Sequence, residues 1–106
     1  MKKSIRKLFV YKNYTIKDVV KSIDIGAKGI ALFVNDDGTL LGTITDGDIR
    51  RSILKGVSLE SSVENVVHYD PISVNQNMTR EEIKDIFIKK AVRVIPVVDD
   101  DNKVID

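Results

Sequence analysis

The sequence predicts an α/β (α+β) domain built from two copies of one small β-α-β-β-α unit, and three observations support this class. The chain matches itself without gaps at an offset of 64 residues. Within each copy, short apolar segments typical of strands alternate with segments whose apolar residues recur at helical spacing. The chain has 106 residues, of which 42% are apolar and 31% charged, a composition that suits one globular domain with its own core.

The repeat aligns residues 15–42 with residues 79–106, and the apolar positions and the polar turn keep their register throughout. The matched apolar pairs include Val19 with Ile83, Ile23 with Phe87, Ile30 with Val94, Phe33 with Val97 and Val34 with Val98. We therefore expect one complete unit at residues 1–57, a connector at 58–70, and a second unit at 71–106 that is cut short. Together the two units form a single domain.

The first copy contains the full set of elements. A short strand is expected at residues 8–10, and a helix begins after the N-cap Thr15, with apolar residues on one face. A continuous apolar strand at 30–34 follows, then a turn rich in Asp, Asn and Gly, and a returning strand at 40–45. A second helix is expected from Asp46 to Lys55, ending at Gly56.

The second copy repeats this order up to its last strand. A short strand is expected at residues 72–74, and Thr79 with Glu82 three residues later forms a capping box that begins a helix. A strand is expected at 94–98, where Pro96 indicates an edge or a strand start. The counterpart of the second helix would lie beyond Asp106.

The composition argues against several classes of protein. The absence of Cys excludes disulfide scaffolds, zinc–thiolate sites and thiol nucleophiles. Lys plus Arg is 17 and Asp plus Glu is 16, a net charge of +1 that argues against nucleic acid as a partner. No apolar run is long enough to span a membrane and no signal peptide is apparent, so we expect no membrane partner and a cytoplasmic protein. We also expect the lone His68 to be a surface residue, and we expect no metal site, no cofactor and no catalytic residue.

The stretch from Gly42 to Arg51 carries the most distinctive motif, Thr45-x-x-Asp48 at the junction of a strand and a helix. Two interpretations fit it. Thr45 or Asp46 is the N-cap of the helix, with Asp48 as a charge that complements the helix dipole. Alternatively, the hydroxyl, the free amides of the first turn and the carboxylate together bind a phosphorylated sugar.

The chain as a whole resembles a CBS-domain pair. The resemblance rests on the tandem repeat, the segment Ile95–Asp99, the Asp-Gly turn, and Gly42-x-x-Thr45-x-x-Asp48. It implies two units packed about a pseudo-two-fold axis, with clefts between them for an adenosine-type ligand (AMP, ADP, ATP or S-adenosylmethionine). It also implies that Asp48 holds the ribose hydroxyls and that Thr45 contacts phosphate or ribose. The other implied site residues are Thr43 and Ile44 in the same pocket, Arg93 and Val94 from the partner unit with Arg93 as a phosphate ligand, and Lys28 as a weaker candidate.

The sequence of residues 43–59 resembles that of the CBS pair at the N-terminus of bacterial sugar-phosphate nucleotidyltransferases. It implies a regulatory module that senses an adenosine nucleotide, attached to a catalytic domain that follows it and paired with a second copy as a homodimer. Arabinose-5-phosphate isomerases share a similar Thr-Asp-Gly-Asp stretch and are the alternative parent. A purely structural dimerisation module that binds no ligand is the alternative function.

Overall fold

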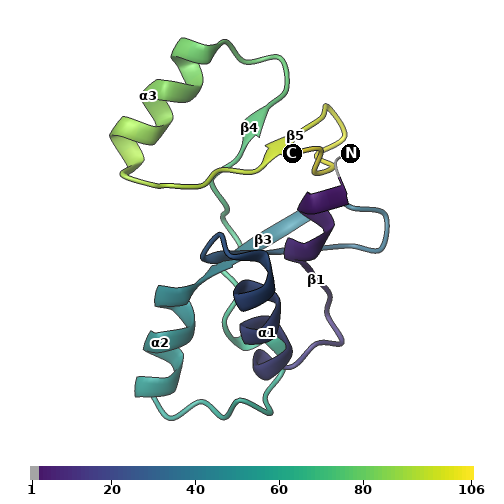
Figure 1. Ribbon diagram of the computed structural model, residues 1–106, viewed down its shortest axis with the longest axis vertical. Coiled ribbons are helices and arrows are strands. Elements are labelled where there is room, and N and C mark those ends of the chain that lie inside the picture. The colour runs from purple at the N-terminus through teal and green to yellow at the C-terminus, as the bar shows by residue number, and fades with distance from the viewer. Residues whose placement is uncertain (1–2) are drawn as a thin grey trace.

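The computed structural model describes residues 3–106 and confirms the α+β class, with helices and two small sheets (Figure 1). The elements are a 3-10 helix Lys3–Leu8, β1 Phe9–Val10, α1 Ile16–Gly26, β2 Ile30–Val34, β3 Leu40–Thr45, α2 Asp46–Leu54, a 3-10 turn Val63–Asn65, β4 Val74–Asn75, α3 Arg80–Lys90 and β5 Val97–Val98. In the first sheet β2 lies between the parallel β1 and the antiparallel β3, whereas β4 and β5 form a parallel pair in the second sheet. No helix of the described residues is long and apolar enough to cross a membrane.

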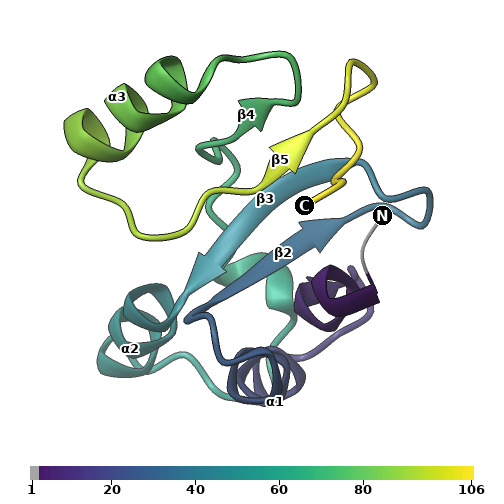
Figure 2. The ribbon, with the colours of Figure 1, turned by 45° about the horizontal axis from the view of Figure 1, so that its top comes forward.

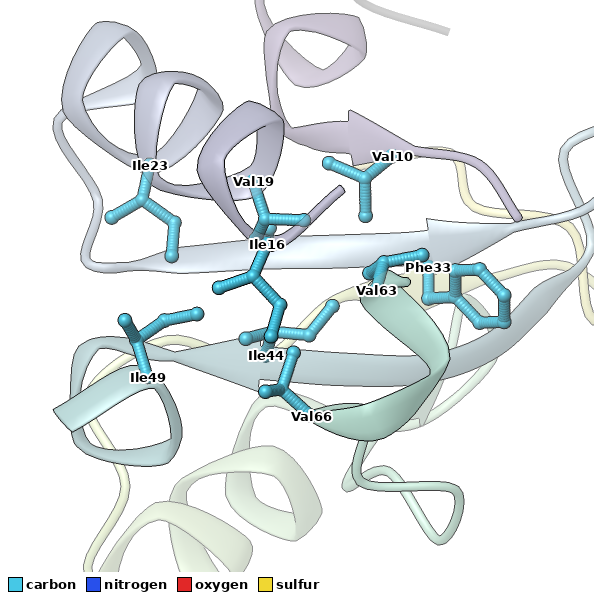
Figure 3. Close-up of a cluster of buried hydrophobic side chains, with 10 residues drawn as sticks. Val10, Ile16, Val19, Ile23, Phe33, Ile44, Ile49, Val63 and Val66 are labelled. Carbon is cyan, nitrogen blue, oxygen red and sulfur yellow. The ribbon is translucent and has the colours of Figure 1, made fainter. Parts of the chain in front are cut away.

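The strand β2 lies at the centre of the molecule and all five of its residues are buried. Alternate side chains of a strand point to opposite faces, so a strand that is apolar throughout is one covered on both faces. Ala31 and Phe33 belong to the cluster under α1 and α2 (Figure 3), whereas Ile30, Leu32 and Val34 pack in a second cluster with residues of the second unit. Figure 2 shows the resulting layers, with α1 and α2 on one side of β2 and β3 and the second unit on the other.

The turns of the two units pair with each other across a local two-fold arrangement. Thr39 forms an antiparallel bridge with Lys103, its own counterpart in the 64-residue repeat. The Leu40 amide donates to the Asn102 carbonyl at 2.9 Å, and the Val104 amide donates to the Gly38 carbonyl at 3.0 Å. These two hydrogen bonds exchange equivalent positions of the repeat, so the pairing relates one unit to the other as a pseudo-two-fold axis does.

All three α-helices begin with a threonine whose side chain forms a capping box, as the sequence predicts at Thr79. Thr15 and Thr79 are confirmed as N-caps, partnered by Asp18 and Glu82. Hydrogen bonds from the Thr15 backbone and hydroxyl lower the pKa of Asp18, and those from Thr79 lower the pKa of Glu82. Both carboxylates therefore stay charged at neutral pH, and their negative charge stabilises the positive N-terminal end of each helix.

The second unit has shorter strands than the sequence predicts. The expected strand at 94–98 is wrong for its first three residues, because regular pairing begins only at Val97. Pro96 has no amide hydrogen to donate to a sheet, although its carbonyl accepts from the Val74 amide at 3.1 Å. The expected strand at 72–74 is likewise displaced and occupies Val74–Asn75. In the first unit Leu8 ends the 3-10 helix, so β1 begins one residue later than expected.

The connector is more structured than its polar sequence suggests. Val63 and Val66 are buried in the cluster under α1 and α2, where Val63 begins a short 3-10 turn and Val66 follows it (Figure 3). The Val63 amide donates to the Tyr14 carbonyl at 2.9 Å. The connector is thus packed against the first unit before the chain crosses to the second.

Candidate functional site

A cleft of about 620 Å³ lies between the two units. The first unit contributes the start of β2, the end of β3 and the first turns of α2, and the second unit contributes the segment between α3 and β5. The lining residues are Lys28, Gly29, Ile30, Thr43, Thr45, Asp46, Asp48, Arg51, His68, Ile72, Ala91, Val92, Arg93 and Val94. Six of the seven residues that the sequence nominates therefore share one cleft.

Ile44 is the exception, and the prediction that it lines this pocket is wrong for its side chain. It is fully buried and packs in the cluster under α1 and α2 (Figure 3). Thr43 and Thr45 flank it on β3, and alternation along a strand sends their side chains to the opposite face. Side chains alternate between the two faces of a strand, so the sequence alone could have placed Ile44 on the face opposite to Thr43 and Thr45.

Thr45 and Asp48 form the capping box of α2 at the wall of the cleft. The Thr45 amide donates to Asp48 Oδ2 at 2.9 Å, the Thr45 hydroxyl donates to the same oxygen at 3.1 Å, and the Asp48 amide lies 3.3 Å from the Thr45 hydroxyl. The structural interpretation of the motif is therefore correct, with Thr45 as the N-cap. The same two side chains remain part of the cleft, so the cap also fixes their orientation toward it.

Arg51 also lines the cleft, although it is not among the residues that the sequence nominates. It lies one turn after Asp48 on α2, and its Nη2 is 2.8 Å from Asp48 Oδ1. The Arg51 side chain is 63% exposed and that of Asp48 is 23% exposed. An ion pair this accessible to water contributes about 0–1 kcal/mol to stability. Spacing of three residues on a helix would have indicated the pair.

Lys28 and Arg93 bring positive charge to the cleft from opposite units. Lys28 directly precedes Gly29, whose φ of +71° turns the chain into β2. Arg93 lies in the segment between α3 and β5, and its neighbour Val94 packs against the cluster between the sheets. Both side chains are exposed. They also line a second, smaller hollow of about 340 Å³ that reaches Phe87 and Asp106.

The connector forms one wall of the cleft through backbone pairing with β3. The Thr43 amide donates to the His68 carbonyl at 3.0 Å, and the His68 amide donates to the Thr43 carbonyl at 2.9 Å. The side chain of His68 is exposed, as predicted, yet the residue borders the cleft together with Ile72. No group of three His, Cys, Asp or Glu side chains suited to a metal ion occurs among the described residues.

Comparison with known proteins identifies the family. A CBS-domain model matches residues 1–55 and matches again at residues 63–106. The chain belongs to the CBS-domain family. It is 30% identical over 99 residues to the CBS domain-containing protein YhcV of Bacillus subtilis, covering 90% of this chain and 68% of YhcV.

Other relatives of this CBS pair are much longer proteins. An uncharacterized protein of Helicobacter pylori strain J99 is 35% identical over 92 residues, which cover 86% of this chain and 28% of that protein. Arabinose 5-phosphate isomerase KpsF of Escherichia coli is 30% identical over 91 residues, which cover 85% of this chain and 28% of the isomerase. The CBS pair thus spans little more than a quarter of these two relatives.

Solved CBS structures share the fold of this chain. The CBS domain protein PAE2072 from Pyrobaculum aerophilum, complexed with AMP, matches with a TM-score of 0.82 at 16% identity, covering 92% of this chain and 76% of that one. The CBS domain pair of protein MJ0100, in complex with 5-methylthioadenosine and S-adenosyl-L-methionine, matches with a TM-score of 0.79 at 21% identity, covering 92% and 76%. The arrangement of two units is therefore that of known CBS pairs.

Proposed function

We propose that this CBS pair is a regulatory module whose cleft binds an adenosine-type nucleotide. The observation that carries the proposal is that six nominated residues from both units line one cleft of about 620 Å³. Pockets for small molecules usually measure roughly 300–1,000 Å³. Two structural neighbours in complex with adenosine-type ligands, PAE2072 and the MJ0100 pair, support the ligand class.

The residues of the cleft suit the parts of a nucleotide. The Asp48 carboxylate accepts hydrogen bonds from vicinal ribose hydroxyls, and Thr43 and Thr45 supply hydroxyl groups on the same wall. Arg93 and Lys28 supply cations for a phosphate, and the planar guanidinium of Arg93 suits bidentate contact. Apolar atoms of Ile30, Ile72 and Val92 remain to contact a base.

The cleft also suggests how a ligand would act on an attached enzyme. A ligand that touches both units favours whichever arrangement of the units it fits best, and its differential affinity shifts the equilibrium between arrangements. Such a shift would be passed to a covalently attached catalytic domain. The similarity to KpsF favours a sugar-phosphate isomerase as the full-length protein, rather than the nucleotidyltransferase that residues 43–59 resemble.

Asp48→Ala tests the ligand site, and we expect it to lower the affinity for AMP at least ~10-fold, the loss of a charge-assisted hydrogen bond. The measurement is calorimetric titration of the 106-residue chain with AMP, ADP, ATP and S-adenosylmethionine, together with thermal unfolding. A nucleotide at 100 times its dissociation constant should stabilise the wild-type fold by about 2.7 kcal/mol.

Asp18→Ala is the matched control, because Asp18 has the same place in the capping box of α1 but does not line the cleft. Each variant loses the carboxylate of its capping box and keeps the N-cap threonine, so we expect both to be destabilised to a similar and modest extent. Only Asp48→Ala should lose ligand affinity. The proposal is wrong if no ligand raises the unfolding midpoint, or if the two variants bind equally well.

We also propose that the module pairs with a second copy of itself through the outer faces of α1 and α2. Val20, Ile53 and Leu54 are exposed there and border a groove of about 420 Å³ between the two helices. Large exposed apolar patches mark interaction sites.

We expect a dimer in sedimentation at micromolar concentration, and Leu54→Asp should convert it to a monomer. A wild-type monomer would exclude this pairing, and a dimer without any nucleotide effect would favour the purely structural function.

A further inference from the structure

The guanidinium of Arg51 lies in the cleft, folded back over the start of α2. Its Nη2 contacts Asp48 Oδ1 at 2.8 Å, and a Cβ atom placed on Gly47 would stand 3.1 Å from Nη1. A cation is disfavoured at the first turn of a helix, where the backbone amides present partial positive charge. The contact with Asp48 therefore offsets the repulsion between the guanidinium and the helix N-terminus, and it holds the guanidinium at the cleft.

The carboxylate of Asp48 has both of its oxygens engaged. Oδ2 accepts from the amide and the hydroxyl of Thr45, which are part of the helix cap. Oδ1 accepts from Arg51. Oδ2 already accepts two hydrogen bonds, whereas Oδ1 accepts one and keeps one acceptor site free. The two vicinal hydroxyls of a ribose need two sites, so a ligand that binds Asp48 through both hydroxyls competes with Arg51 for Oδ1.

The consequence for Arg51 depends on what else the ligand carries. With a nucleoside, the displaced guanidinium gains no new anionic partner from the ligand. With a nucleotide, the phosphate offers the released guanidinium a fork of oxygens in the same cleft. The ion pair is exposed to water, so little free energy opposes the exchange once a second anion is present.

We infer that Arg51 makes the cleft select adenosine ligands that carry a phosphate, by exchanging Asp48 for the phosphate when the ribose takes Asp48. This inference rests on the proposed nucleotide function and names the ligand class within it: AMP, ADP or ATP rather than adenosine or 5-methylthioadenosine, which carry no anionic group. Arg51 is a specificity-determining residue in this scheme. Arg93 and Lys28 add to the phosphate affinity, but within residues 3–106 neither forms a hydrogen bond or ion pair with the Asp48 carboxylate.

The test is equilibrium titration of the 106-residue chain and its Arg51→Gln variant with AMP and with adenosine. We expect the variant to lose AMP affinity at least ~10-fold, as a charge-assisted contact disappears. Its affinity for adenosine should be unchanged or higher, because Asp48 Oδ1 is then free of its competitor. Opposite or unequal effects on the two ligands are the signature of the exchange.

Arg50→Gln is the matched control, since it removes the same charge from the neighbouring position, which does not line the cleft. It should keep the wild-type ratio of AMP to adenosine affinity, and unfolding midpoints without ligand will show that both variants fold. If Arg51→Gln keeps that ratio while wild type binds AMP, the inference is overturned and the proposed function stands. If wild type binds neither ligand, the proposed function fails and the inference fails with it.

Discussion

Ile44→Ala is expected to destabilise the domain by about 2–5 kcal/mol, the usual result of truncating a buried isoleucine. Ile44 is 0% exposed and packs between β3 and the helices α1 and α2 (Figure 3). A domain of this size has a total stability of about 5–15 kcal/mol, so one cavity removes a large share of it. Urea unfolding monitored by circular dichroism measures the change.

The same variant separates a core residue from a ligand-binding one. Because the Ile44 side chain points away from the cleft, nucleotide affinity of the folded fraction should stay within ~2-fold of wild type at low temperature, well under the tenfold step that 1.4 kcal/mol represents. Ile88→Ala is the control, since Ile88 is 69% exposed on α3 and its truncation should cost far less stability. A stable Ile44→Ala variant that binds nucleotide poorly would contradict both the packing and the correction made at this residue.

Gly42→Ala is expected to cost about 1–3 kcal/mol, because a side chain there collides with the connector where it pairs with β3. A Cβ atom on Gly42 would overlap Val67 Cγ1 and stand 2.7 Å from the His68 carbonyl oxygen. Relieving the contact requires the connector to move, and this weakens the two hydrogen bonds between Thr43 and His68. The wall of the cleft moves with them, so we expect lower nucleotide affinity as well as lower stability.

Gly47→Ala provides the contrast with the same chemical change. The atoms nearest to its new Cβ belong to the flexible end of Arg51, and alanine is favoured over glycine in a helix by about 0.5–1 kcal/mol. We expect Gly47→Ala to be neutral or stabilising. Equal unfolding midpoints for the Gly42 and Gly47 variants would show that the connector does not need the space above Gly42.

Local signals in the sequence predict the helices well. The sequence predicts N-caps at Thr15 and Thr79, with a capping box at Thr79, and leaves the N-cap of the second helix open between Thr45 and Asp46; the structure confirms both N-caps and adds capping boxes at Thr15 and Thr45. A capping box closes within a single turn, so it depends on few residues outside the helix. The strands of the second unit are predicted less well, because pairing depends on partners far along the chain and Pro96 removes one donor.

The resemblance to a CBS-domain pair implied which residues would meet at the site, although it did not give their orientation. Thr45, Asp48, Lys28 and Arg93 converge on one cleft. Their convergence follows from the pseudo-two-fold relation between two copies of one unit. The sequence does not show that Arg51 lines the cleft and Arg50 does not, because the side of α2 that faces the cleft depends on where the second unit lies.

The repeated unit, the helix starts and the place of the Thr45-x-x-Asp48 motif at a strand–helix junction are predictable from the sequence, since they depend on period and on signals within a turn. Three features depend on the folded arrangement: Ile44 is a core residue between two cleft residues, the connector pairs with β3 through His68, and Arg51 lines the cleft. Each of these depends on which face of β3 or α2 is covered by the second unit. The second unit covers its face of the first because β2 is apolar on both faces. One face of β2 packs under α1 and α2, and the other packs against residues of the second unit, 64 residues later in the repeat.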